Sequence, residues 1–170
     1  LDGAGDHYHC TGIAWRGGEG DSAETILEDA VVMSPCAAAA IYHRDIYVSM
    51  GGMAEYFFCY YEDVDLGLRF RLLGHETIQL AGAKVRHVGS TTAGKNSKFI
   101  KYYVSRNRIW TFIRCVPGSL FAACLPLMIL SIVTRLCFSI FAGDTSTKLK
   151  AFFDAFRRLF RIWNDRKVIQ

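Results

Sequence analysis

The segment from Tyr60 to Gly74 constrains the fold of this chain most strongly, because it places three carboxylates at the start of a helical apolar pattern. Apolar side chains recur at steps of three and four in two sets: Val64, Leu68 and Leu72, and Leu66, Phe70 and Leu73. This spacing predicts a short, largely buried helix that ends at Gly74 as its C-cap. The acidic residues Glu62, Asp63 and Asp65 then lie at the helix N-terminus.

Two explanations fit these carboxylates. Acidic residues are favoured in the first turn of any helix, where backbone N–H groups are unpaired, and Asp65 can also pair with Arg69 one turn later. An apolar environment, in contrast, raises the pKa of a carboxyl group and can make it a general base. Aromatic residues occupy positions 57, 58, 60 and 61, just before the acids. Both explanations therefore stay open for Glu62 and Asp63.

The residues around this helix also carry a resemblance. The run Gly51-Gly52-Met53-Ala54-Glu55-Tyr56-Phe57-Phe58 is followed by Tyr61-Glu62-Asp63-Val64-Asp65-Leu66, and then by Arg69, Leu73 and Gly74. This order resembles the acceptor-side signature of family 2 glycosyltransferases, particularly the rhamnosyltransferase-like bacterial members. The similarity extends over nearly the whole chain, from the loop at 17–21 to Arg106-Asn107 and the basic C-terminus. Met53 and Ala54 replace the Phe and Asp that the family usually has, so no role of that Asp is carried over.

The resemblance implies an α/β fold for residues 1–115, namely the C-terminal, acceptor-side half of a GT-A glycosyltransferase. Enzymes of this type are normally longer and begin with a nucleotide-binding half, so we expect the 170-residue chain to be a C-terminal fragment. Asp63 would act as general base on an acceptor hydroxyl in an inverting transfer, and Glu62 would orient the site or the acceptor. The fragment alone would be inactive.

His87 is the expected metal ligand. It follows a predicted strand, at about the separation from Asp63 that the resemblance implies for a histidine that helps to hold a divalent metal. A histidine at a strand end is commonly structural, although neutral imidazole is also a good ligand for divalent metals. With the motif upstream, we expect His87 to bind Mg²⁺ or Mn²⁺ on the nucleotide diphosphate, with other ligands partly outside this chain.

Residues 89–96 nearly match the phosphate-binding loop G-x-x-x-x-G-K-[ST]. Asn96 stands where that loop needs a hydroxyl for its magnesium ion, so a P-loop nucleotide hydrolase is only a third hypothesis. The resembling family has a Gly-rich loop of small residues at this place. In that loop Lys95 or Ser97 could still contact a phosphate.

Shorter patterns predict the remaining elements of the first 115 residues. We expect buried segments over 30–33 and 36–42, the second a candidate strand, and one or two helical turns over 45–50. Alternating side chains predict strands over 77–80 and 84–88. Six cysteines are scattered without metal-ligand spacing, which predicts reduced thiols in a cytosolic chain.

Residues 99–115 form a predicted helix in which aromatic and basic side chains alternate. Such a pattern can bind single-stranded nucleic acid, but the net charge is only +4 and the positive excess lies elsewhere in the chain. We therefore expect no nucleic-acid partner. In the resemblance Arg106 lies near the mouth of the active site, where it could contact the diphosphate. The alternative is a solvated basic face.

The composition changes after Pro117. Residues 120–142 form an apolar run interrupted at Thr134 and Arg135. About 20 apolar residues span a bilayer, but an arginine near the centre costs roughly 2.5–3.5 kcal/mol. We therefore expect a re-entrant or in-plane helical hairpin over this run, followed by a turn at 143–146.

The last predicted helix is amphipathic. Leu149, Phe152, Phe153, Phe156, Phe160 and Trp163 share one face at steps of three and four, opposite a basic face. Residues 148–170 hold seven Lys or Arg against two Asp. Bulky apolar side chains beneath cationic ones are typical of helices at an anionic membrane surface. The alternative is that the aromatic face packs on the preceding domain.

Together these patterns predict an acceptor-side domain over 1–115 and an all-helical, membrane-associating tail over 116–170. The function we expect is transfer of a sugar from a nucleotide-sugar donor to a hydroxyl of a glycan or lipid-linked acceptor in cell-surface polysaccharide assembly. The expected location is the cytoplasmic face of the inner membrane. The leading alternative is a non-catalytic membrane-binding module or remnant without a donor site.

Overall fold

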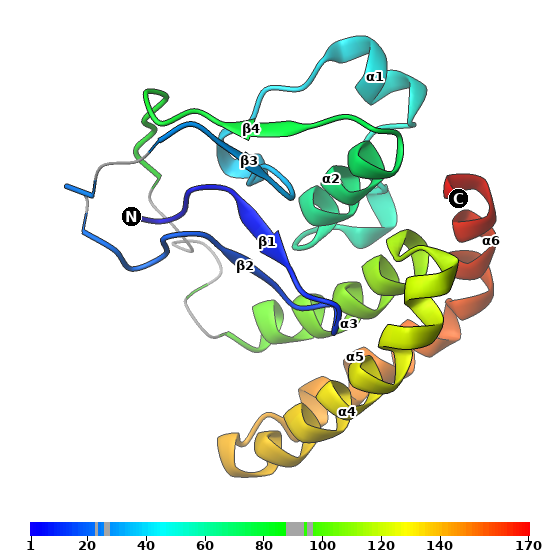
Figure 1. Cartoon of the computed structure of the whole chain (residues 1–170). Helices are drawn as coiled ribbons and strands as arrows, with labels where there is room; N and C mark the ends of the chain where they lie inside the picture. The colour runs from blue at the N-terminus through cyan, green and yellow to red at the C-terminus, as the bar shows by residue number, and fades with distance from the viewer. Residues whose placement is uncertain (23, 26–27, 88–93, 95–96) are drawn as a thin grey trace.

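The computed structural model describes residues 1–22, 24–25, 28–87, 94 and 97–170. The chain has a mixed α/β structure that is 57% helical, with small antiparallel sheets (Figure 1). Strand β1 (Asp6–Tyr8) pairs with β2 (Ala14–Arg16), and β3 (Ala30–Val32) pairs with β4 (Thr77–Gln79). A β-bridge between Asp6 and Ser34 connects the first sheet to the segment after β3. The expected α/β class is therefore correct at this coarse level.

Helix α3 is the helix against which α2, α5 and α6 pack (Figure 1). In chain order they are α1 (Arg44–Ser49), α2 (Glu62–Leu72), α3 (Lys98–Cys115), α4 (Gly118–Ala142), α5 (Thr145–Arg157) and α6 (Leu159–Ile169), with 3-10 turns η1 (Ala37–Ala39) and η2 (Glu55–Phe57). Helix α2 packs against α3, and α5 and α6 pack along it. One core cluster contains Phe57 and Leu68 together with Ala155 and Ile162. Residues on both sides of the predicted boundary at 115/116 thus share a core.

Several predicted elements are confirmed. Helix α2 has the predicted position and ends beside Gly74, which has the positive φ expected after a helix. Strand β4 and helices α1 and α3 also form where the patterns indicated. The candidate strand over 36–42 is wrong, because three of its four alanines, which lack the branched side chains that stabilise a strand, form η1. Residues 84–87 form no strand, and Val88 lies outside the described residues.

The arginines of α3 show that the alternative of a solvated basic face is wrong. Arg106, Arg108 and Arg114 are all buried, so they do not form a solvated basic face. Arg106 and Arg108 donate hydrogen bonds to neighbouring segments, and Arg114 forms an ion pair with Asp65 of α2. The Arg108 Nη2 atom, for example, donates to the Thr11 carbonyl and to the Ser131 Oγ atom, both at 2.7 Å. Burial of a guanidinium group is tolerated because its donors find such acceptors.

The apolar run does not form the expected helical hairpin. Helix α4 continues through Thr134 and Arg135, because neither residue breaks a helix and both side chains are exposed. The turn comes at Gly143, whose φ of 67° ends the helix in a left-handed conformation. By length and composition α4 could cross a membrane, and only 11% of its most apolar window is buried.

The final amphipathic segment is two helices rather than one. It breaks at Arg158, between α5 and α6. Ala155 and Ile162 are buried in the core cluster, and Ala151 is buried as well. Phe153, Phe156 and Phe160 are exposed by 64%, 60% and 81%. The alternative that the aromatic face packs on the domain is therefore wrong for these three residues, although Phe152 is half-buried against the core.

Candidate active site

The loop before α2 has an unusual backbone. Phe58, Tyr60 and Tyr61 all have positive φ angles of 63–70° although none is glycine. Phe58 has φ 69° and ψ −59°, and the Cys59 N–H donates to the Phe57 carbonyl at 2.9 Å. This is the rare, strained form of the γ-turn. Conformations of this kind persist only where surrounding contacts determine them, and they are concentrated at functional sites.

Asn107 and Arg106 of α3 supply those contacts. The side-chain amide nitrogen of Asn107 lies 3.0, 2.8 and 2.7 Å from the carbonyl oxygens of Phe57, Cys59 and Tyr60. The Arg106 Nη2 atom also donates to the Phe57 carbonyl, at 2.8 Å. One buried turn of α3 therefore fixes the loop that leads into α2.

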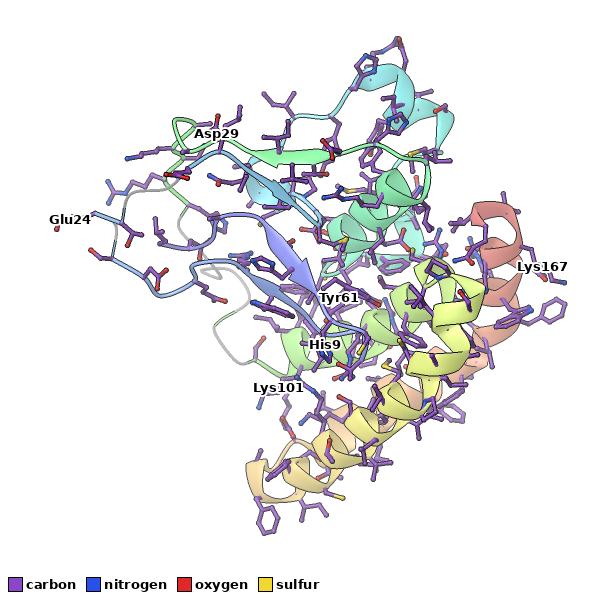
Figure 2. The ribbon with its side chains drawn as sticks, viewed as in Figure 1. His9, Glu24, Asp29, Tyr61, Lys101 and Lys167 are labelled. Atoms are coloured by element: carbon purple, nitrogen blue, oxygen red, sulfur yellow. The ribbon has the colours of Figure 1, made fainter. Side chains whose placement is uncertain are left out.

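Tyr61 joins this loop to the first sheet. It is the N-cap residue of α2, in a left-handed conformation with φ 70°. Its hydroxyl accepts a hydrogen bond from the Ala14 N–H at 2.9 Å and donates to the Gly12 carbonyl at 3.2 Å. Figure 2 shows Tyr61 between β2 and the helices. The beginning of α2 is thus held from both the α3 side and the sheet side.

The three carboxylates at this helix start have different environments. Asp65 is fully buried, with its Oδ2 atom 2.9 Å from Arg69 Nε and its Oδ1 atom 3.0 Å from Arg114 Nη1. The predicted pairing with Arg69 is confirmed, and Asp65 is a structural residue. Asp63 accepts the N–H of Ala37 at 3.1 Å and that of Val64 at 2.9 Å. The pKa of Glu62 is raised by burial and by the charge of Asp63.

Glu62 and Tyr42 both have a buried oxygen without a hydrogen-bond partner among the described residues. Burial raises the pKa of the Tyr42 hydroxyl, and the charge of Asp63 raises it further. Burial raises the pKa of Asp6 to about 6, again with a contribution from Asp63. Asp63 is therefore the common centre of an acidic, partly desolvated region. Buried polar atoms that lack partners in a native fold are candidates for contact with a ligand.

A cavity of about 510 Å³ lies beside this region. Its wall includes Cys36 and Ala38, the two neighbours of the Ala37 residue that binds Asp63. The segment before this wall also lies very close to α2, because a Cβ atom added at Gly67 would be only 2.1 Å from the Ser34 Cβ atom. Asp63 and Glu62 therefore lie behind one wall of the cavity, on a helix that is attached to that wall.

His87 lines the same cavity, together with Asp2 and Arg16. The Asp2 Oδ2 atom is 2.6 Å from His87 Nδ1 and 2.7 Å from Arg16 Nη1. Imidazole and carboxylate are both ligands for Mg²⁺ or Mn²⁺, and Mg²⁺ on a nucleotide commonly takes one or two carboxylates with phosphate and water oxygens. His87 and Asp2 fit such a partial ligand set. Among the described residues, no group of three or more His, Cys, Asp or Glu could hold a metal ion.

The other predicted site residues lie elsewhere. Arg106 lies at a second cavity, between α3 and α5, that shares no lining residue with the first. Its expected contact with a diphosphate stays a prediction. Lys95 and residues 89–93 and 96 of the phosphate-loop alternative are outside the described residues. Ser97 is described, and its hydroxyl caps α3 by accepting the Ile100 N–H.

Sequence reasoning missed Tyr42 and Asp2, and it quoted Asn107 in the resemblance without assigning it a role. A signal existed for Asn107, because an asparagine within an apolar helical pattern must find acceptors if it is buried. Asp2 and Tyr42 have no comparable signal, since each is brought to the site by a loop. Comparisons with protein-family models, with curated proteins and with solved structures gave no significant match to this chain.

Asn107→Ala should destabilise the protein by roughly 2–4 kcal/mol, because the loop carbonyls lose a buried donor while the strained backbone remains. Urea unfolding would measure the loss. The matched control is Asn164→Ala on the exposed face of α6, for which we expect a change within about 0.5 kcal/mol. Equal effects of the two substitutions would show that other contacts hold the loop.

Asp6 should make stability depend on pH. Its folded-state pKa of about 6 lies above the ordinary value of 3.8, so the folded protein binds the extra proton between these values. The free energy of unfolding should therefore fall as pH rises from about 4 to 6, by roughly 2–3 kcal/mol, and then level off. Asp6→Asn should remove this slope in urea titrations at several pH values. A slope that persists would belong to another group.

Proposed function

We propose that this chain is the acceptor-side part of an inverting glycosyltransferase that transfers a sugar from a nucleotide-sugar donor to the hydroxyl of a glycan or lipid-linked acceptor. One observation carries the proposal. A rigidly held helix start carries two adjacent carboxylates, Glu62 and Asp63, in a partly desolvated acidic region behind the wall of a cavity. A general base for a hydroxyl needs such a fixed, weakly solvated carboxylate. The GT-A fold belongs to this proposal as well, since the small sheets support only the α/β class.

Asp63 is the proposed base. Its two carboxylate oxygens each accept one backbone N–H, which fixes the orientation of the group and leaves lone pairs for a further donor. In the reaction it takes the proton of the acceptor hydroxyl as that oxygen attacks the anomeric carbon and the diphosphate leaves. Glu62, whose Oε2 atom is buried without a partner among the described residues, orients the acceptor by hydrogen bonding.

His87 and Asp2 are the residues of this chain that would hold a divalent metal with the donor. When bound, Mg²⁺ or Mn²⁺ neutralises the negative charge of the departing diphosphate. Arg16 shares Asp2 with His87 and helps to fix that carboxylate at the cavity lining. The remaining ligands would come from a nucleotide-binding half that is supplied outside residues 1–170.

The helical tail supports a location at a membrane surface. Helix α4 is long and apolar enough to span a bilayer, and Phe153, Phe156 and Phe160 of α5 and α6 are exposed beside exposed arginines. This surface also favours the second candidate, a non-catalytic membrane-binding module. No observation in the described residues favours a P-loop hydrolase.

The enzymatic candidate is tested by Asp63→Asn in the full-length protein. We expect turnover to fall on the order of 10²–10⁴, the usual contribution of a positioned base, with little change in donor binding. The matched control is Asp45→Asn, an exposed carboxylate on α1, which should leave turnover unchanged. Normal turnover of Asp63→Asn would make Asp63 a helix-capping residue and would favour the membrane-binding module.

His87→Ala tests the metal proposal. The side chain is 36% exposed, so its loss should change the melting temperature little, while the Mg²⁺ or Mn²⁺ concentration needed for activity should rise on the order of tenfold or more. His43→Ala, an exposed histidine before α1, is the control and should change neither quantity. A large loss of stability with unchanged metal dependence would identify His87 as a packing residue.

A further inference from the structure

The second cavity, of about 330 Å³, lies between α3 and α5, which pack side by side (Figure 1). It is lined by Tyr102, Arg106, Trp110, Asp154, Arg157 and Arg158. Three of these six side chains are arginines, and one is a carboxylate. The formal charge of the lining is therefore positive, and the transfer reaction proposed above does not require this pocket.

Arg106 forms the fixed inner wall of the pocket. Its side chain is only 9% exposed, and its guanidinium carbon lies 4.2 Å from the ring centre of Trp110 and 4.7 Å from that of Tyr103. The Nε atom donates to Asn107, and the Nη2 atom donates to the Phe57 carbonyl. These contacts orient the guanidinium before any ligand arrives, which lowers the entropic cost of binding.

Arg157 and Arg158 form the outer rim. Both side chains are exposed, and they lie at the break between α5 and α6. The single carboxylate, Asp154, accepts the Tyr102 hydroxyl at 2.7 Å. Among the described residues, neither Arg157 nor Arg158 forms an ion pair with a carboxylate, so both are available to an added anion. Planar guanidinium groups match phosphate oxygens with paired N–H donors.

The surroundings of the pocket favour a phosphate that is attached to an apolar group. The Arg157 guanidinium lies 5.7 Å from the ring centre of Phe153, which is itself largely exposed, as are Phe156 and Phe160 on the same pair of helices. A soluble anion would make no use of these rings. An amphiphile would place its head group at the arginines and its apolar chain against the rings.

We propose that this pocket binds the phosphate group of an anionic lipid at the membrane surface. The inference rests on the membrane-surface part of the proposed function and not on the sugar-transfer reaction. Its failure can therefore be distinguished from failure of the Asp63 experiment. A free inorganic phosphate has the same binding chemistry, and the test separates these two sources.

The test measures binding of the intact chain to phosphatidylcholine vesicles that contain either phosphatidic acid or phosphatidylglycerol, at matched surface charge. Phosphatidic acid exposes a phosphomonoester that can enter the pocket, so it should bind several-fold more tightly. Arg157→Gln with Arg158→Gln should abolish this several-fold preference, so that the two vesicles bind equally. The matched control, Arg161→Gln with Lys167→Gln, removes the same charge outside the pocket and should weaken binding to both vesicles equally.

A substitution that should increase the preference for phosphatidic acid separates a loss of the site from misfolding, because misfolding cannot strengthen a preference between two lipids. Asp154→Asn removes the only carboxylate of the pocket lining but can still accept the Tyr102 hydroxyl, so the preference for phosphatidic acid should rise several-fold. Phe156→Asp with Phe160→Asp should abolish binding to all vesicles.

Three outcomes would contradict the proposal. The phosphate site would be overturned if the intact chain binds the two lipids equally, or if the variant at Arg157 and Arg158 behaves like the control variant at Arg161 and Lys167. Inorganic phosphate that competes at concentrations similar to the lipid would overturn the lipid as its source. Absence of binding to any vesicle would overturn the membrane surface itself.

Discussion

The Asn107 amide and the backbone carbonyls of residues 57–60 form the contact on which the rest of this molecule depends. A loop with three positive φ angles in non-glycine residues is costly, and it persists here because a buried donor on α3 bonds to its carbonyl oxygens. The loop sets the direction in which α2 begins, and α2 carries the candidate carboxylates. Helix α3 is thus more than an apolar packing element, since its buried polar side chains determine the backbone of the site.

The sequence allowed much of the helical structure to be predicted. The patterns at 60–74 and 99–115 were strong because apolar side chains recur at helical steps, and both helices formed. The strand predicted over 36–42 was wrong because the small alanine side chains at 37–40 carry no pattern that distinguishes a strand from a 3-10 turn. The hairpin expected over 120–142 from the cost of an arginine in a bilayer was also wrong, because Thr134 and Arg135 do not interrupt a helix whose surface is exposed.

The candidate site was only partly predictable, for a related reason. The position of the three carboxylates follows from the helical pattern. Which of them is structural does not, because Asp65 is distinguished from Glu62 and Asp63 only by the arginines that pair with it. Arg114 lies 49 positions after Asp65 and pairs with it across α2 and α3. Likewise, Asp2 meets His87 through a loop contact of 85 positions. Such long-range pairings are created by the tertiary fold and leave no local pattern in the chain.

Ion pairs and one hydrogen bond connect the carboxylate helix to the tail. Asp65 on α2 pairs with Arg114 on α3, Arg114 lies 3.9 Å from Asp165 on α6, and the Tyr56 hydroxyl donates to Asp165. The first turn of α2 and the last helix therefore belong to one rigid unit with no linker between them. For a molecule attached to a membrane by its tail, this rigidity would keep Asp63 at a constant height above the lipid surface. The depth at which an acceptor presents its hydroxyl would then become a criterion of selection, as important as the chemistry of the acceptor.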